Sequence, residues 1–231
     1  AMTQRIYNYP GFPEGINFYD LGFSFYKQAQ RYGTDFIFEN VISMDLAGRI
    51  KKIYTNQQTI IESKAVIIAA GSKPRYLGIP GEEKFKGRGV SYCAICDGPF
   101  YKNKLVAVVG GGNSALEEGL YLTKFASKVI IIHRRADFRA SNVIEKEARN
   151  NPKISFLLDT VVEEVLGDDK VKSLIIKNVK TSEIKEINVD GIFIFIGSEP
   201  NTKFISNIVE TDSQGYIITD ELLQTNIKGV Y

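Results

Sequence analysis

The chain has 231 residues, 44% of them hydrophobic, which is enough for one large or two modest domains with packed cores. Its 29 Lys and Arg residues nearly balance its 27 Asp and Glu residues, which argues against a nucleic-acid-binding protein and against an acidic tail. No stretch approaches the roughly 20 apolar residues of a membrane span, and residues 1–5 lack the apolar core of a signal peptide. We therefore expect a cytoplasmic protein that does not enter a membrane.

The first part of the chain predicts one helix and several strands. A turn-rich loop over residues 7–13 precedes an amphipathic helix over residues 18–32, which ends at Gly33. Apolar and alternating segments then predict strands over residues 35–46, 49–54, 59–62 and 65–71. The last of these, Ala-Val-Ile-Ile-Ala-Ala-Gly, is predicted as a buried strand.

A segment with two prolines and two glycines, residues 74–81, predicts the first domain boundary. Beyond residue 102, strands and helices alternate as in a Rossmann β-α-β unit with an antiparallel insertion. The predicted strands cover residues 105–109, 128–132, 154–158, 161–165, 171–177, 184–189 and 191–197, and the helices cover residues 114–126 and 141–150. A second boundary at Pro200 divides the chain into segments 1–77, 78–199 and 200–231. We expect the two outer segments to form one discontinuous domain.

A glycine turn follows the apolar strand at residues 105–109. In Gly110-x-Gly112-x-x-Ala115, the first glycine permits a tight turn, the second lets a pyrophosphate approach the backbone, and the alanine allows close helix packing. Asn113 and Ser114 begin the next helix, whose N-terminal amides attract phosphate. The alternative is a turn whose glycines serve geometry alone. The strand before the turn and the helix after it favour a dinucleotide site.

The end of the next strand predicts which nucleotide binds. Arg134 lies 24 residues after Gly110, where an NAD-selective site would carry an acid, and its neighbours His133, Arg135 and Arg139 are also basic. A solvated basic strand end is the alternative. Together with the glycine turn, this cluster predicts the 2′-phosphate of NADP(H).

The chain has two cysteines, Cys93 and Cys96, and their spacing allows a reducible disulfide. The neighbouring Asp97 could deliver a proton to a leaving thiolate. One alternative is a structural zinc site, but His133 is the only further soft ligand. Another is a pair of packed, inert thiols. We therefore favour a redox centre and expect no metal.

Three motifs together resemble the low-molecular-weight bacterial thioredoxin reductases. They are Cys93-Ala-Ile-Cys96-Asp97-Gly98, Gly110-Gly-Gly-Asn-Ser-Ala115 and His133-Arg-Arg-x-x-Phe-Arg139. The resemblance implies an α/β fold of two Rossmann-like, three-layer ββα domains: a discontinuous FAD domain and an inserted NADPH domain that carries the disulfide. It implies a homodimer that passes electrons from NADPH through FAD to the disulfide and on to thioredoxin. It also implies that Cys96 faces the flavin, that Cys93 attacks thioredoxin and that Asp97 is the acid.

The resemblance adds expected cofactor contacts outside these motifs. Asn8, Ala70 and Gly71 match segments that line FAD, and we assign Ile196 and Gly197 to the cofactor-binding set as well. The family's first Gly-x-Gly-x-x-Gly loop and its Ala-Gly-Asp segment are not in this chain. We therefore expect the 231 residues alone to bind FAD poorly and to turn over little.

Two alternatives to a thioredoxin reductase remain. One is the flavoprotein reductase of a peroxiredoxin system, and the other is a non-catalytic NADP(H)-binding module. The disulfide and the nucleotide turn lie on one domain and must both reach a flavin on the other. We therefore expect residues 77–82 and 196–200 to act as paired hinges.

Overall fold

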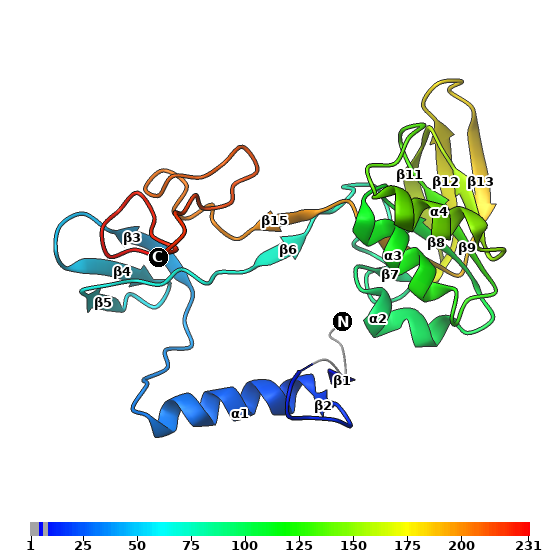
Figure 1. Cartoon of the computed structure of the whole chain (residues 1–231). Helices are drawn as coiled ribbons and strands as arrows, with labels where there is room; N and C mark the ends of the chain where they lie inside the picture. Colours follow the sequence, from blue (N-terminus) through cyan, green and yellow to red (C-terminus); the bar gives the residue numbers. More distant parts are fainter. Residues whose placement is uncertain (1–4, 7–8) are drawn as a thin grey trace. The chain divides into compact units, whose positions relative to one another are not determined.

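The computed structural model describes residues 5–6 and 9–231 of the chain. The chain divides into two compact units (Figure 1). Unit 1 comprises Ala1–Lys27 and Pro74–Gly197, and unit 2 comprises Gln28–Lys73 and Ser198–Tyr231. Each unit is therefore built from two separate stretches of sequence.

Unit 1 is organised around a five-stranded parallel sheet in the order β10-β9-β8-β14-β7. Its strands are β7 (Val90–Ser91), β8 (Leu105–Val109), β9 (Lys128–Ile132), β10 (Ile154–Leu157) and β14 (Gly191–Ile194). Most residues of β8 and β14 are buried, as expected for strands covered on both faces. The strand order reverses direction beside β8, so a ligand site is expected at the carboxyl end of this strand.

Two layers cover this sheet and make unit 1 a three-layer structure. On one face lie α2 (Ala94–Asp97), the short 3₁₀ helix Gly98–Tyr101, α3 (Asn113–Leu122) and α4 (Asn142–Asn150), with a core that includes Leu116, Leu122 and Ile131. On the other face lies an antiparallel sheet of β11 (Thr160–Gly167), β12 (Val171–Asn178) and β13 (Ile184–Asn188), with a core that includes Leu174 and Ile192. The predicted Rossmann-type α/β fold is confirmed.

The N-terminal stretch contains an antiparallel pair, β1 (Arg5–Ile6) and β2 (Ile16–Asn17), which precedes α1 (Phe18–Arg31). Unit 2 contains an antiparallel sheet of β3 (Val41–Asp45), β4 (Lys51–Thr55) and β5 (Ile60–Ser63). A small core of Leu46, Ile205, Val209 and Val230 joins its two stretches. The chain passes from one unit to the other within α1, between Lys27 and Gln28, and again at β6 (Ser72–Pro74) and at β15 (Ser198–Pro200). β6 and β15 form a two-stranded ribbon.

Several predicted elements differ from the structure. The strand predicted over residues 191–197 ends at Ile194. Residues 65–71 form no named strand, because this segment pairs with residues 229–231 on one side and leaves Ile67 80% exposed. The strand predicted from residue 35 begins only at Val41, since residues 34–40 adopt no regular structure. Helix α3 ends at Leu122 and not at Ala126, because the chain turns at residues 123–125. Within the described residues, no helix has both the length and the apolar character that crossing a membrane requires.

Candidate functional site

The turn after β8 forms a cradle at the start of α3. Gly110 has a φ of +151°, and a Cβ there would lie 2.3 Å from the carbonyl oxygen of Phe195, so only glycine fits. Gly112 caps α3 in an extended conformation, and a Cβ there would meet nothing within 4 Å. Ala115 is fully buried, whereas Asn113 and Ser114 are exposed. The open backbone at Gly112 and the helix N-terminus provide the donors and the space that a pyrophosphate needs.

The segment after β9 wraps around this cradle. The amide of Arg139 donates a hydrogen bond of 2.7 Å to the carbonyl oxygen of Gly111. The amide of Ser141 donates one of 2.7 Å to Oδ1 of Asn113. Arg134, Arg135 and Arg139 are exposed. The arginine-bearing segment is therefore bound directly to the glycine turn, as a site for a nucleotide phosphate requires.

His133 lies apart from the exposed arginines, because its side chain is buried beneath the glycine turn. The residue is 5% exposed, its ring stacks on Phe138 at 5.3 Å, and a Cβ on Gly111 would lie 2.1 Å from its Cε1 atom. Burial lowers the pKa of His133, and the neighbouring arginines lower it further against the opposing effect of the Asp137 carbonyl. The imidazole is therefore mainly neutral at pH 7 and supports the turn from below.

Cys93 and Cys96 form a disulfide, with their Cα atoms 5.3 Å apart. Cys93 is the N-cap of α2, and its Sγ accepts a hydrogen bond of 3.2 Å from the amide of Cys96. Both cysteines are partly exposed, and Ile95 between them is 50% exposed. The disulfide is therefore accessible enough to react with a second molecule.

Asp97 follows the disulfide and is held by Ser91, which the sequence interpretation missed. The Ser91 hydroxyl donates a hydrogen bond of 2.6 Å to Oδ2 of Asp97, and it accepts one of 3.1 Å from the amide of Cys93. Ser91 is 4% exposed. A small polar residue two positions before the first cysteine was the only signal in the sequence. The arrangement fixes a carboxylate beside the disulfide.

A second carboxyl group lies behind α2. Glu118 is on α3, which packs against α2, and its Oε2 atom is buried without a hydrogen-bond partner among the described residues. Burial raises the pKa of this carboxyl, the charge of Glu117 raises it further, and the backbone amide of Ala94 opposes the rise. Glu118 therefore adds a titratable group close to the residue that follows Cys93.

The remaining predicted cofactor residues lie elsewhere. Ile196 packs partly against the core of unit 1, and the carbonyl oxygen of the exposed Gly197 accepts a hydrogen bond from the amide of Arg75. Ala70 and Gly71 belong to unit 2, where their carbonyl oxygens accept hydrogen bonds from Asn201. Asn8 lies outside the described residues.

The two expected cofactors fit the described residues differently. A dinucleotide with a 2′-phosphate fits the cradle at Gly112 and the exposed arginines beside it. Unit 2 has no strand–glycine–helix turn of this kind among its described residues. We therefore derive no reaction step from a flavin site there. Among the residues that the structure describes, no group of three or more His, Cys, Asp or Glu side chains could hold a metal ion.

The chain matches a protein-family model and is similar to several known proteins. The family model described as pyridine nucleotide-disulphide oxidoreductase matches residues 1–231. A thioredoxin reductase of Streptomyces coelicolor is 42% identical over 99% of this chain and 71% of its own. A bifunctional thioredoxin reductase/thioredoxin of Mycobacterium leprae is 42% identical over 99% of this chain and 50% of its own. The structure of Lactococcus lactis thioredoxin reductase in the FR conformation is 43% identical, covers 99% of this chain and 75% of its own, and superposes with a TM-score of 0.79.

Proposed function

Because the chain belongs to the thioredoxin reductases of the pyridine nucleotide-disulphide oxidoreductase family, we propose that it passes electrons from NADPH through FAD to a disulfide and on to thioredoxin. Membership of this family confirms the resemblance drawn from the three motifs. The observation that carries the proposal is that unit 1 holds both the Cys93–Cys96 disulfide and the glycine turn of Gly110 and Gly112. NADPH and FAD are the cofactors of this family.

The two cofactors are assigned to different parts of the chain. We assign NADPH binding to residues 78–199 and FAD binding to residues 1–77 and 200–231. The contacts within the chain divide it before Pro74 and after Gly197, a few residues earlier than the predicted boundaries. They also group Ala1–Lys27 with the inner stretch and not with Gln28–Lys73, so residues 1–77 do not form one unit as predicted. The ribbon of β6 and β15 lies at this division. We also propose that the protein works as a cytoplasmic homodimer, which sedimentation of the purified protein and fractionation of cells would test.

Binding of NADPH uses groups with separate roles. The backbone at Gly110 and Gly112 and the N-terminus of α3 face the pyrophosphate. The guanidinium groups of Arg134 and Arg135, with Arg139, bind the 2′-phosphate by charge-assisted hydrogen bonds. His133 keeps the turn in place and presents no charge.

Reduction of the disulfide needs two electrons and two protons, and the S–S bond breaks to give two thiols. FAD, a cofactor of this family, would supply the redox chemistry between NADPH and the disulfide. Asp97, held by Ser91, provides a proton to the sulfur that leaves as thiolate. We assign Cys96 as the cysteine that faces the flavin, following the resemblance.

Transfer of the two electrons to thioredoxin re-forms the Cys93–Cys96 disulfide. Cys93 gives its proton to Asp97 and attacks the disulfide of thioredoxin as a thiolate, which forms a mixed disulfide. The thioredoxin thiolate that leaves takes this proton from Asp97. Cys96 then attacks Cys93, which restores the intramolecular disulfide and releases thioredoxin as a dithiol. The M. leprae relative, whose name joins the two activities in one protein, supports thioredoxin as the partner.

The test supplies the purified chain with FAD, NADPH and oxidised thioredoxin and counts thiols on both proteins. We expect NADPH-dependent reduction of Cys93 and Cys96 followed by reduction of thioredoxin. A Cys96→Ser variant should form a stable mixed disulfide with thioredoxin and should not turn over. If the Cys93–Cys96 pair stays oxidised in the presence of NADPH in protein whose absorbance spectrum shows bound FAD, the proposed function is wrong.

A further inference from the structure

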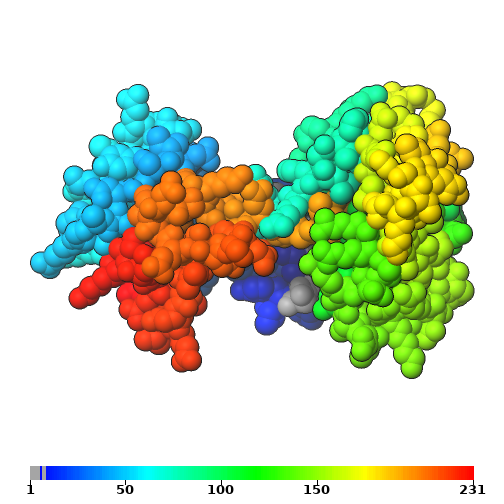
Figure 2. All heavy atoms as spheres, turned by 90° about the horizontal axis from the view of Figure 1, so that it is seen from above, coloured from blue at the N-terminus to red at the C-terminus, as the bar shows by residue number. Residues whose placement is uncertain are grey.

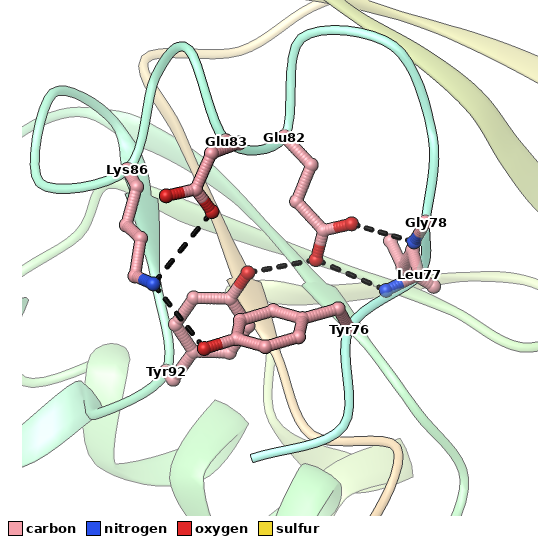
Figure 3. Close-up of polar contacts among 7 residues, drawn as sticks. All are labelled: Tyr76, Leu77, Gly78, Glu82, Glu83, Lys86 and Tyr92. Atoms are coloured by element: carbon pink, nitrogen blue, oxygen red, sulfur yellow. Dashed lines mark hydrogen bonds and ion pairs between the residues drawn. The ribbon is translucent and has the colours of Figure 1, made fainter. Parts of the chain in front are cut away.

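Glu82 is a buried carboxylate in the linker loop, which we define as residues 77–82. It is 4% exposed, and three donors surround it. Oε1 accepts hydrogen bonds from the amide of Leu77 at 3.0 Å and from the hydroxyl of Tyr92 at 2.7 Å, and Oε2 accepts one from the amide of Gly78 at 2.7 Å (Figure 3). A buried carboxylate is costly unless such donors satisfy it, so these contacts hold the loop firmly.

The linker loop is also bound to the antiparallel sheet of unit 1. The carbonyl oxygen of Pro80 accepts a hydrogen bond of 3.0 Å from the amide of Val165 on β11. Gly81 lies so close that a Cβ would sit 2.0 Å from the Val165 carbonyl oxygen. The hinge expected at residues 77–82 is therefore wrong in position, because this loop is part of unit 1. The division between the units lies before it, at Pro74.

Tyr92 connects the linker loop to the redox centre. Its ring packs edge-on against Tyr76 at 5.2 Å, and Nζ of Lys86 lies 6.0 Å from its centroid. Lys86 donates a hydrogen bond to the Tyr76 hydroxyl and pairs with Glu83. Burial raises the pKa of Tyr92, and the bond to Glu82 raises it further, so the hydroxyl remains a donor at physiological pH.

Three consecutive residues therefore make three different connections at one strand end. Ser91 binds Asp97, Tyr92 binds Glu82, and Cys93 forms the disulfide. The bonds from Glu82 to Leu77 and Gly78 close a local turn, whereas the bond to Tyr92 joins two segments ten residues apart. The local turn has its own donors, so the Tyr92 hydroxyl is a further donor that Glu82 receives from the strand end.

We propose that Glu82 and Tyr92 are positioning residues for the redox centre: their hydrogen bond holds the strand end that carries Cys93 against the linker loop and favours the disulfide over the dithiol. This inference rests on the proposed function. The hydrogen bond is present in the disulfide form, and we infer that it is weaker in the dithiol, so by linkage it stabilises the disulfide. Its loss should therefore make the disulfide easier to reduce.

The experiment measures the equilibrium of the full chain with glutathione. Two glutathione thiols reduce Cys93–Cys96 to two cysteine thiols, supply the two protons and leave as glutathione disulfide. In the Tyr92→Phe variant we expect the equilibrium constant for reduction to rise about threefold or more. Tyr76→Phe is the matched control, because it removes the hydroxyl of the neighbouring ring, which does not contact Glu82. It should match the wild type.

A second variant and a measurement of amide exchange also test the role of the Glu82–Tyr92 hydrogen bond. Glu82→Gln weakens the same contact from the other side, because it replaces the charged carboxylate with a neutral amide that has only one acceptor oxygen, and it should shift the equilibrium in the same direction as Tyr92→Phe. Amide hydrogen exchange of Leu77 and Gly78 should become about threefold faster or more in Tyr92→Phe and stay unchanged in Tyr76→Phe.

The outcomes separate this inference from the proposed function. If the wild type equilibrates with glutathione and both Tyr92→Phe and Glu82→Gln match it, the positioning role is overturned while the proposed function stands. A change in amide exchange without a change in the equilibrium also overturns it, since Glu82 would then only close the loop. A wild-type disulfide that never equilibrates overturns both proposals.

Discussion

The hydroxyl of Ser91 donates a hydrogen bond of 2.6 Å to the carboxylate of Asp97, across the disulfide helix α2. Ser91 is buried at the end of β7, and its hydroxyl oxygen also receives the amide of Cys93. The position of the proposed proton donor is therefore set by the same strand that carries the first cysteine. In the space-filling view, the stretch Pro74–Gly197 of unit 1, which contains β7 and α2, is coloured from cyan through green to orange (Figure 2).

Replacing Ser91 with alanine should slow thiol–disulfide exchange. The variant removes the donor that fixes Asp97, and a typical hydrogen bond contributes about 0.5–1.5 kcal/mol. We expect the pre-reduced protein to reduce thioredoxin about three- to tenfold more slowly in a stopped-flow measurement. Ser127→Ala is the control, because that exposed hydroxyl binds only the carbonyl oxygen of Lys104. Equal rates for Ser91→Ala and the wild type would contradict the role of Ser91.

Neighbouring glycines in the nucleotide turn should respond differently to alanine. A Cβ at Gly111 would lie 2.3 Å from Nδ1 of His133, so Gly111→Ala should lower the free energy of unfolding by about 1–3 kcal/mol. A Cβ at Gly112 meets no protein atom within 4 Å, so Gly112→Ala should keep its stability. Since Gly112 faces the pyrophosphate in our proposal, this variant should bind NADPH more weakly by on the order of tenfold.

Thermal unfolding and calorimetric titration with NADPH distinguish the two glycine effects. If Gly112→Ala binds NADPH as tightly as the wild type, the pyrophosphate does not lie against this turn. If Gly111→Ala is as stable as the wild type, His133 is free to move aside.

Local sequence patterns predicted the parallel sheet well. The apolar runs at β8 and β9 match the predicted strands residue for residue, because each is bounded by a glycine turn or by a charged segment. The apolar run at residues 65–71 was wrongly predicted as a buried strand, since hydrophobicity does not show how many strands will pair with a segment. Side-chain contacts between residues that lie apart in the sequence were not predicted. Glu82 was predicted only as part of a hinge, and His133 was grouped with the basic arginines although it is buried.

The exposed arginines should decide the choice of nucleotide. Arg134→Ala combined with Arg135→Ala removes two charge-assisted contacts to the 2′-phosphate, so affinity for NADPH should fall about 10- to 100-fold while affinity for NADH stays unchanged. Lys128→Ala, at the opposite end of β9, controls for the loss of positive charge. Titration of the protein with each nucleotide measures the preference. Equal losses for NADPH and NADH would show that the arginines act on a shared part of the two nucleotides.

Glu118 should make stability depend on pH. Its carboxyl has a pKa raised above the ordinary value, chiefly by burial, so the folded protein favours the protonated form. Stability from this group is therefore complete below the unfolded-state pKa and is lost as the pH rises through the folded-state pKa. Glu118→Gln mimics the protonated form and should raise the melting temperature at pH 7 by about 1–3 °C, a small effect because solvent screens a half-buried group.

The same substitution should have no effect at pH 4, where the wild-type carboxyl is already mostly protonated. Glu117→Gln, on the exposed neighbour, is the matched control and should show a weaker pH dependence. Melting curves from pH 4 to pH 8 compare the three proteins. If Glu118→Gln is less stable than the wild type by the same amount at every pH, the carboxyl is ionised in the folded protein and accepts hydrogen bonds behind α2. Its pKa would then be lowered and not raised.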